Sequence, residues 1–448
     1  MKVDVSIGEA VDKLSILEIK LQKIKDEVKQ IEIQKEIEAL SHCDLYKNTF
    51  YYTLLVGINE QIWDITDCVK QMKKEDIGFS SLSHKIFELN QKRFRIKQWY
   101  NLAYSSNLKE QKGYALTHCN VWIEDLEIFY DKLPHLLSIC LEYDHVTIVS
   151  DYSETIKPIV NIPTVIYSTD VSIQKDIDLK TYEIDKEMLQ FELKPITYIS
   201  GGLLGDFVYQ LSVIQEVYLK TGRKGILYIS NDMGGDNFRF GLERTYQDTY
   251  QIVSSQKYIR SYQLFQNEPY DINLSIWRYS NIEIPWDQIF FNTYHISWGM
   301  HPWIKVPYDP KWKDIVLVTT TSYHAVHNID YPTLYKEYGH MLQFIDLSEK
   351  ETELFKTTHG IEDLVLYKPL DFYEMCVAIK SCKLFIANYS APLAFAYGMH
   401  TPSIVGMCYS DDVRHVGLEK KMPHLTICPD VGGVMETIRQ KLNRTSLK

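Results

Sequence analysis

The stretch YISGGLLGDFVYQLSVIQEVY, residues 198–218, changes character at its centre. Its first residues are β-branched and aromatic, as in a buried strand, whereas the residues after Asp206 carry apolar side chains at helical spacing. Gly201, Gly202 and Gly205 separate the two parts, and glycine allows a sharp turn and a close approach of the backbone to a ligand. A strand, a glycine turn and a helix in this order predict a parallel α/β sheet, in which ligands bind beyond the carboxyl ends of the strands.

The chain after residue 195 repeats this alternation of apolar runs and helical patterns. One series contains GILYIS at 225–230 and INLSIW at 272–277, and a second runs from DIVLVTTT at 314–321 to KLFIAN at 383–388. Continuous apolar runs joined by helices are typical of parallel sheets that are buried on both faces. We therefore expect an α/β fold class with two Rossmann-like domains.

The first Rossmann-like domain is expected at residues 195–300 and the second, which would bind a nucleotide sugar, at residues 301–448. The segment SWGMHPWIKVPYDPKWKD at 297–314 is rich in Trp and Pro and is the expected linker between them.

The N-terminal third is expected to be helical. Its apolar residues alternate steps of three and four and so form one stripe: Val11, Leu14, Leu17, Leu21, Ile24, Val28 and Ile31. The segment NVWIEDLEIFYDKL at 120–133 predicts a further helix. These patterns predict a helical bundle or hairpin domain at 1–140, followed at 141–194 by a small αβ appendage and a connector. The alternative is that the stripe forms a surface through which two copies of the chain make a homodimer.

Composition and charge exclude several classes of partner. A net charge of -11 over 448 residues argues against nucleic acid, because proteins that bind it carry a surplus of Lys and Arg. The sequence has no apolar run of the roughly 18 residues that a membrane span needs, and its start lacks the regions of a signal peptide. The 8 cysteines are scattered without a C-x-x-C pair, which favours reduced thiols in a cytoplasmic protein and disfavours structural zinc.

A second candidate turn lies in NYSAPLAFAYGMHTPSIVG, residues 388–406. An apolar run ends at its first residue, and a helix of small side chains follows. Free N–H groups at the start of that helix could bind a diphosphate. The candidate ligand-binding residues are Asn388, Tyr389, Ser390, Ala391 and Pro392. The structural alternative is an Asn/Ser cap on a core helix.

Two further segments offer groups that bind phosphate. Thr320, Thr321 and Ser322 follow the first apolar run of the last domain and supply hydroxyl donors, to which His324 and His327 could add. A solvated loop is the alternative. Arg414 could reach a phosphate or an acidic substrate, or it could make a surface salt bridge.

Asp206 is the candidate catalytic residue. An acid at the start of a helix is a good cap, because it faces the positive end of the helix dipole. The functional alternative is a carboxylate between two domains that acts as a general base on a hydroxyl. The sequence contains no G-x-G-x-x-G fingerprint, no P-loop and no H-E-x-x-H zinc motif.

GGLLGDFVYQLSVI and NYSAPLAFAYGMHTPSIVG together resemble the heptosyltransferase-like glycosyltransferase family 9, a group of GT-B enzymes, over residues of about 195–445. The resemblance implies that Asp206 is the general base and that Ser390, Ala391 and Pro392 contact the nucleotide diphosphate. Asn388 stands where the family has Asp, Ala391 where it has Gly, and NIDYPTLY at 328–335 lacks the family's lysine. The opening VSIGEAVDKLSILEIKLQKI resembles an uncharacterised bacterial family of helical proteins associated with glycan genes.

The resemblance implies an inverting glycosyltransferase that moves a sugar from a nucleotide-sugar donor to a glycan acceptor hydroxyl in polysaccharide or surface glycan synthesis. No metal and no cofactor are expected, because helix N-termini, hydroxyls and a basic side chain can stabilise the leaving diphosphate. Two other functions remain open at this point. The chain could be a nucleotide- or glycan-binding scaffold with little catalysis, or a nucleotide-sugar epimerase.

Overall fold

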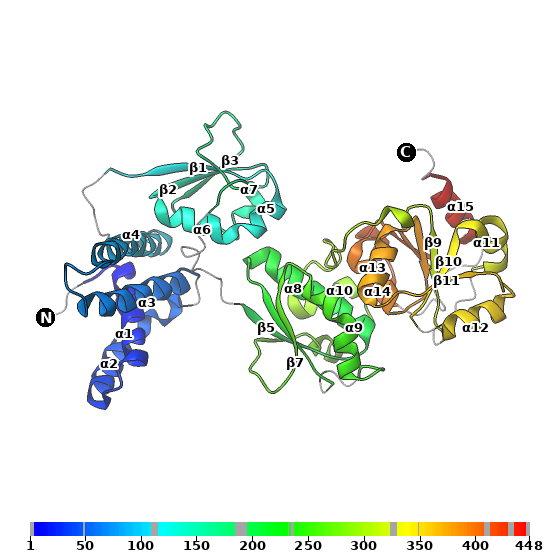
Figure 1. The fold of residues 1–448 in the computed structure, drawn as a ribbon, viewed down its shortest axis with the longest axis horizontal. Helices are drawn as coiled ribbons and strands as arrows, with labels where there is room; N and C mark the ends of the chain where they lie inside the picture. The colour runs from blue at the N-terminus through cyan, green and yellow to red at the C-terminus, as the bar shows by residue number, and fades with distance from the viewer. Residues whose placement is uncertain are drawn as a thin grey trace. The chain divides into compact units, whose positions relative to one another are not determined.

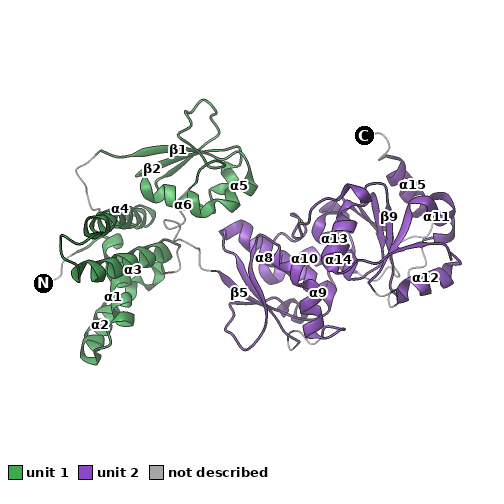
Figure 2. Cartoon of the chain, in the orientation of Figure 1, with its two compact units in different colours: residues 1–194 green, residues 195–448 purple. Residues whose placement is uncertain are grey.

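The computed structural model describes residues 4–47, 50–108, 115–183, 195–231, 233, 237–322, 329–347, 349–406, 413–428 and 434–444. The chain forms two compact units, residues 1–194 and 195–448, which Figure 2 colours green and purple. The finer division into four domains stays a prediction.

Unit 1 begins with four long helices (Figure 1): α1 (Ile7–Lys23), α2 (Glu27–Ala39), α3 (Phe50–Lys70) and α4 (Phe79–Ala103). The apolar stripe predicted for this region is confirmed in α1, where Val11 and Leu14 are fully buried. It fails beyond α1, because Ile24 is extended and Asp26 caps a new helix, which leaves Val28 72% exposed.

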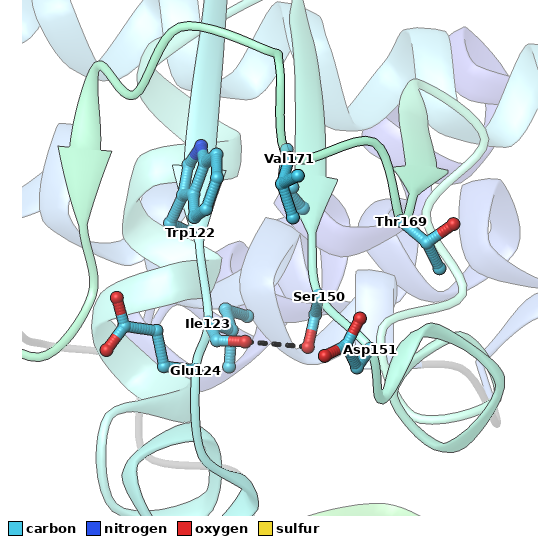
Figure 3. Close-up of a pocket in the computed structure, with 8 residues that line it drawn as sticks. Trp122, Ile123, Glu124, Ser150, Asp151, Thr169 and Val171 are labelled. Atoms are coloured by element: carbon cyan, nitrogen blue, oxygen red, sulfur yellow. Dashed lines mark hydrogen bonds between the residues drawn. The ribbon is translucent and has the colours of Figure 1, made fainter.

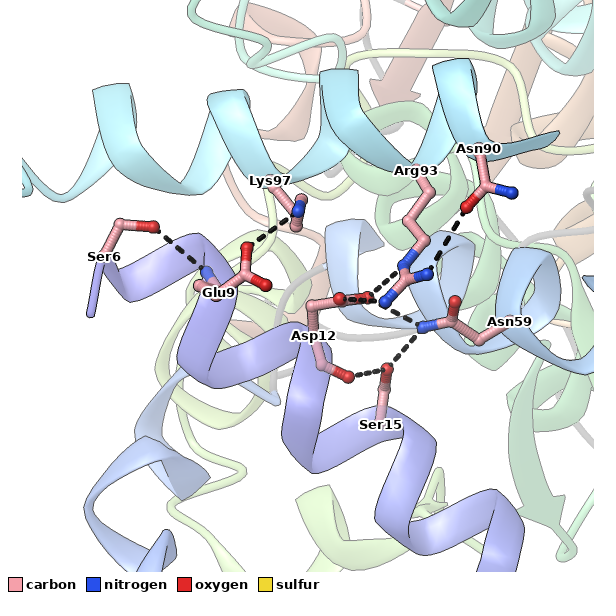
Figure 4. A network of polar contacts seen from close by, with 8 residues as sticks. All are labelled: Ser6, Glu9, Asp12, Ser15, Asn59, Asn90, Arg93 and Lys97. Carbon is pink, nitrogen blue, oxygen red and sulfur yellow. Dashed lines mark hydrogen bonds and ion pairs between the residues drawn. The ribbon is translucent and has the colours of Figure 1, made fainter. Parts of the chain in front are cut away.

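A polar network ties α1 to its neighbours. Asp12 on α1 is 1% exposed, and Figure 4 shows it between Arg93 on α4 and Asn59 on α3. Arg93 donates to the Asp12 carboxylate from Nε (2.8 Å) and from Nη2, and Asn59 Nδ2 donates to it at 2.9 Å. Gly8 makes the close approach of the helices possible, because a Cβ there would lie 2.3 Å from the carbonyl oxygen of Lys97.

Unit 1 continues as a parallel sheet with the order β3-β2-β1-β4. Its strands are β1 (His118–Trp122), β2 (His145–Val149), β3 (Val165–Ser168) and β4 (Ile177–Asp178), and its helices are α5 (Leu126–Asp131), α6 (Leu133–Glu142) and α7 (Ser153–Ile156). The helix predicted at 120–133 is therefore wrong at its start, since residues 120–122 pair with β2. The predicted connector contributes the edge strand β4.

The first half of unit 2, green in Figure 1, contains a parallel sheet with the order β7-β6-β5-β8. Its elements are β5 (Ile196–Ser200), α8 (Leu204–Thr221), β6 (Gly225–Ile229), α9 (Leu242–Ser254), β7 (Ile259–Leu264), β8 (Ile272–Asn273), the 3-10 helix η2 (Ile276–Tyr279) and α10 (Trp286–Tyr294).

The second half of unit 2 contains a parallel sheet with the order β11-β10-β9-β12-β13-β14. Its strands are β9 (Val316–Thr319), β10 (Leu342–Ile345), β11 (Val365–Tyr367), β12 (Leu384–Ala387), β13 (Ser403–Gly406) and β14 (Leu425–Cys428). Its helices are α11 (Tyr331–Tyr338), α12 (Lys350–His359), α13 (Phe372–Ser381), α14 (Ala391–Met399), α15 (Val434–Arg444) and the 3-10 helix η6 (Val413–His415). The expected α/β fold class with two Rossmann-like sheets is confirmed.

An aromatic block joins the two halves of unit 2. It consists of Tyr209, Trp286, Trp298, Trp303 and Tyr397. Trp298 and Trp303 come from the predicted linker, yet each is only 1% exposed. The indole nitrogen of Trp303 donates to the carbonyl of Val208 on α8 at 2.9 Å. The linker is thus packed between the halves.

Within the described ranges, no helix combines the length and the apolar character needed to cross a membrane.

The stacked rings of His400 and His424, with centroids 4.3 Å apart, make the stability of unit 2 pH-dependent. Burial lowers the pKa of His400 to about 4 and the pKa of His424 to about 3. In the unfolded chain both pKa values return to about 6.5, so below that pH the unfolded state binds more protons than the folded state. We expect the urea midpoint of unit 2 to fall as the pH is lowered from about 6.5 toward 4. His424→Phe should flatten this dependence, and the same substitution at exposed His340 should not.

Candidate functional site

The order of the second sheet of unit 2 identifies where a ligand is expected. Chain order reverses between β9 and β12, and in open parallel sheets ligands bind at this switch point, beyond the carboxyl ends of the strands. Ala387 pairs with Thr319 at the ends of the two strands. The segments 320–322 and 388–390, both predicted from the sequence to bind a ligand, therefore begin at the same point of the same sheet edge.

Asn388 joins these two segments. Its side chain is fully buried, its Oδ1 accepts from the backbone N–H of Thr321 at 3.1 Å, and its Nδ2 donates to the carbonyl of Thr321 at 2.9 Å. Both ends of the amide are thus used to hold the turns together. The amide of Asn388 thus bonds to Thr321 through both of its groups, and the direct ligand contact predicted from the sequence stays a prediction.

The three hydroxyls at 320–322 differ in their surroundings. Ser322 donates to Glu351 from its backbone N–H (2.8 Å) and from its hydroxyl (3.1 Å), so a carboxylate already accepts both of its hydrogen bonds. Thr320 and Thr321 are partly exposed at the end of β9. His324 and His327 lie outside the described residues.

The second predicted turn leads into α14 without a side-chain cap. Ser390 is the N-cap residue, but its hydroxyl donates back to the carbonyl of Asn388 at 3.1 Å. Ala391 and Pro392 are partly exposed in the first turn, and proline has no N–H to donate. The N–H groups of the first turn therefore lack a side-chain acceptor among the described residues, as an anion site at a helix N-terminus requires.

The first sheet of unit 2 has a switch point as well, between β5 and β8. Asp206, in the first turn of α8, accepts from Arg278 Nη2 at 2.6 Å across this point. The side chains are only 18% and 9% exposed. The Arg278 guanidinium also lies over the ring of Trp277, 4.5 Å from its centroid. Arg278 was not predicted from the sequence, although its place just after β8 puts it at the same sheet edge.

The glycines of the opening turn make room mainly for other parts of the protein. A Cβ on Gly201 would lie 2.3 Å from the carbonyl oxygen of Ser230, and a Cβ on Gly202 would lie 2.2 Å from Arg278 Nη2. Gly202 also has a φ of +104°, which L side chains rarely adopt. The sequence had suggested that these glycines make room for a donor or acceptor. At Gly201 and Gly202 protein atoms fill that space.

Gly205 brings the two predicted turns together. A Cβ on Gly205 would lie 4.0 Å from Cα of Ala391 and 4.0 Å from Cβ of Ala394, which is ordinary contact distance. The first turns of α8 and α14 therefore meet, and neither helix has a side-chain cap. Asp206 follows Gly205 directly, so the candidate base is the next residue along the chain from the contact with the candidate diphosphate turn.

Tyr389 and Arg414 belong to a second cluster beside this site, built around buried His415. Tyr389 stacks on the His415 ring with centroids 4.0 Å apart. Trp286 Nε1 donates to His415 Nε2 at 3.3 Å, and because an indole nitrogen only donates, the proton of His415 is on Nδ1, 2.9 Å from the Tyr397 hydroxyl. The Arg414 guanidinium lies over the Trp286 ring, 5.4 Å from its centroid. His415 thus fixes the turn that carries Tyr389.

In the described part of the chain, no set of three or more His, Cys, Asp or Glu side chains is arranged to hold a metal ion.

Comparison with known proteins gives one family match, at the N-terminus. Residues 1–121 match a family of unknown function, DUF6165. A search of curated protein sequences found no match.

Several solved structures are similar to the chain. ADP-heptose LPS heptosyltransferase II of E. coli is 9% identical, with a TM-score of 0.38, over 56% of this chain and 99% of that one. A family 9 glycosyl transferase of Veillonella parvula is 11% identical, with a TM-score of 0.25, over 74% and 93%. A UDP-GlcNAc 2-epimerase of Neisseria meningitidis is 11% identical, with a TM-score of 0.24, over 72% and 91%. These TM-scores are too low to support a function, which has to be argued from the site itself.

Proposed function

We propose that unit 2 is a metal-independent inverting glycosyltransferase that transfers a sugar from a nucleotide-sugar donor to a hydroxyl of a glycan acceptor. The observation that carries this proposal is the contact between the first turns of α8 and α14 at Gly205 and Ala391. Gly205, which meets the uncapped first turn of α14, directly precedes Asp206, and this supports a role for the Asp206 carboxylate in the same reaction.

The donor would lie at the switch point of the second sheet. Its diphosphate would accept hydrogen bonds from the N–H groups at the start of α14 and from the hydroxyls of Thr320 and Thr321, and the helix dipole would stabilise its negative charge. Glu351, which already accepts from Ser322, has the chemistry to accept from a ribose hydroxyl, as acidic residues do in other Rossmann-type sites.

The reaction would need one base and one stabilised leaving group. The acceptor hydroxyl gives its proton to the Asp206 carboxylate while its oxygen bonds to the anomeric carbon of the sugar. The bond from that carbon to the diphosphate oxygen breaks, and the oxygen keeps the electron pair. The N-terminus of α14 and the Arg278 and Arg414 guanidinium groups would supply positive charge to stabilise it.

A second candidate is a nucleotide-binding scaffold without transfer. The ion pair between Asp206 and Arg278 favours it, because Oδ2 is already engaged at 2.6 Å. The two candidates differ in one measurement. A transferase releases nucleoside diphosphate from a donor when an acceptor is added, whereas a scaffold binds the nucleotide and leaves the donor intact.

The test of the donor site uses thermal unfolding of the full chain with ADP, UDP, GDP and CDP. One of them should raise the Tm, by an amount that corresponds to about 2.7 kcal/mol at one hundred times its Kd. Ser390→Asp should abolish most of this shift, because a carboxylate at the N-cap repels the diphosphate. The basal Tm should hold or rise, since Asp is a good N-cap.

The matched control is Ser390→Ala, which introduces no charge and should keep the nucleotide shift. If no nucleoside diphosphate raises the Tm, the donor site is wrong. If Ser390→Asp keeps the full shift, the nucleotide binds somewhere other than α14.

A further inference from the structure

Unit 1 has a pocket of its own, which is distant in the sequence from the candidate site of unit 2. Its sheet has the order β3-β2-β1-β4, which repeats the pattern of β7-β6-β5-β8 in unit 2. The pocket has a volume of about 70 Å³ and lies at the carboxyl ends of β1, β2 and β3. It is half open to solvent. Its main lining residues are Trp122, Glu124, Ser150, Asp151, Thr169 and Val171 (Figure 3). This is the edge at which parallel sheets bind ligands.

Several of these groups are already fixed by the protein. The Ser150 hydroxyl donates to the carbonyl of Ile123 at 2.7 Å, the dashed line in Figure 3. Glu124 accepts from Lys175 Nζ at 3.3 Å, and the same ammonium lies over the ring of Trp122, 5.0 Å from its centroid. These contacts hold one wall of the pocket in place.

Asp151 and Thr169 differ from Ser150 and Glu124 in their hydrogen bonding. Both side chains are exposed, and neither makes a side-chain hydrogen bond to another described residue. Asp151 therefore offers both carboxylate oxygens as acceptors, and Thr169 offers a donor and an acceptor. A ligand that supplies hydroxyl groups would satisfy them.

The charge and shape of the pocket select the class of ligand. Two carboxylates repel phosphates and other anions, and Lys175 beside Glu124 disfavours a cation there. The indole of Trp122 and the side chain of Val171 provide an apolar wall. A neutral sugar ring matches this combination, because it has hydroxyl donors at its rim and apolar C–H groups on its faces. The small enclosed volume fits one sugar residue only in part.

We propose that the pocket in unit 1 binds a neutral sugar residue, with its hydroxyls donating to Asp151 and Glu124. Because the pocket opens to solvent, the sugar can be the terminal residue of a longer glycan. The site shares no residue with unit 2, so it stands whether or not unit 2 transfers sugar.

The experiment is saturation-transfer NMR and calorimetry on the full chain with glucose, galactose, mannose and N-acetylglucosamine. At least one sugar should bind saturably. Asp151→Asn should weaken that binding by about tenfold or more, because one carboxylate oxygen becomes an NH2 donor and the remaining oxygen is a neutral, weaker acceptor. Trp122→Leu should weaken it as well, through the loss of the aromatic wall.

Two control variants separate this site from its surroundings. Asp170→Asn changes an acid on the same loop that bonds to Ser172 and does not line the pocket, so binding should persist. Asp206→Asn should also leave sugar binding intact, because that residue is in unit 2. The proposal is overturned if no sugar of the panel binds, if Asp151→Asn and Trp122→Leu bind like the wild type, or if Asp206→Asn removes the binding.

Discussion

Asp206→Asn should lower kcat for sugar transfer by about 10²–10⁴-fold, the usual contribution of a general base. The amide has nearly the shape of the carboxylate but cannot take the acceptor's proton. KM for the donor should change little, since the proposed donor contacts come from α14 and the turn after β9. The measurement is steady-state release of the nucleoside diphosphate that raises the Tm, from its nucleotide sugars and in the presence of glycan acceptors.

The control for this prediction is Glu216→Gln on the same helix. Glu216 is 5% exposed and pairs with His301 Nδ1 at 2.8 Å, so it is also an ion-paired acid of α8. It lies well beyond the first turn of the helix, and its variant should keep kcat. Equal losses in both variants would point to damage to α8, and full activity of Asp206→Asn would remove Asp206 from the mechanism.

Asp12→Ala should lower the free energy of unfolding of unit 1 by about 3–5 kcal/mol. Asp12 is 1% exposed, and its removal leaves Arg93, itself 24% exposed, and Asn59 without their shared acceptor. The measurement is urea unfolding of the full chain, followed by circular dichroism. Unit 1 of the variant should then unfold at lower urea than unit 1 of the wild type.

Asp64→Asn is the matched control on the same pair of helices. Asp64 on α3 pairs with Lys23 on α1, but its side chain is 64% exposed. Exposed ion pairs contribute about 0–1 kcal/mol, so this variant should unfold nearly as the wild type does. If the two variants lose equal stability, the buried network does not hold α1 in place.

The sequence was sufficient to predict an element where the residues of that element alone determine its structure. The helix predicted after Asp206 is α8, Leu204–Thr221, because its apolar spacing continues until Gly222 takes a left-handed conformation with φ 68°. The parallel sheets of unit 2 were predictable for a similar reason, since strands such as Val316–Thr319 are buried along their whole length and read as apolar runs.

Local sequence failed where a distant partner decides the structure. Residues 120–122 have a helical pattern but pair with 147–149, so the sheet overrides the local preference. For the candidate site, the sequence predicted that the turn at 201–206 and the turn at 388–392 contact the substrates. It could not indicate that Arg278 bonds to Asp206 or that Asn388 bonds to Thr321, because these contacts join residues 72 and 67 positions apart.

The aromatic block between the halves of unit 2 bears on how substrates enter. A hinge opening of the two halves has to part Tyr397 from Tyr209 and Trp298, and to break the bond from Trp303 to Val208. Each ring pair contributes about 0.5–1.5 kcal/mol beyond its buried area, so their combined loss opposes such a motion. We expect the two halves to move as one rigid body, with access to the site controlled by its surface turns.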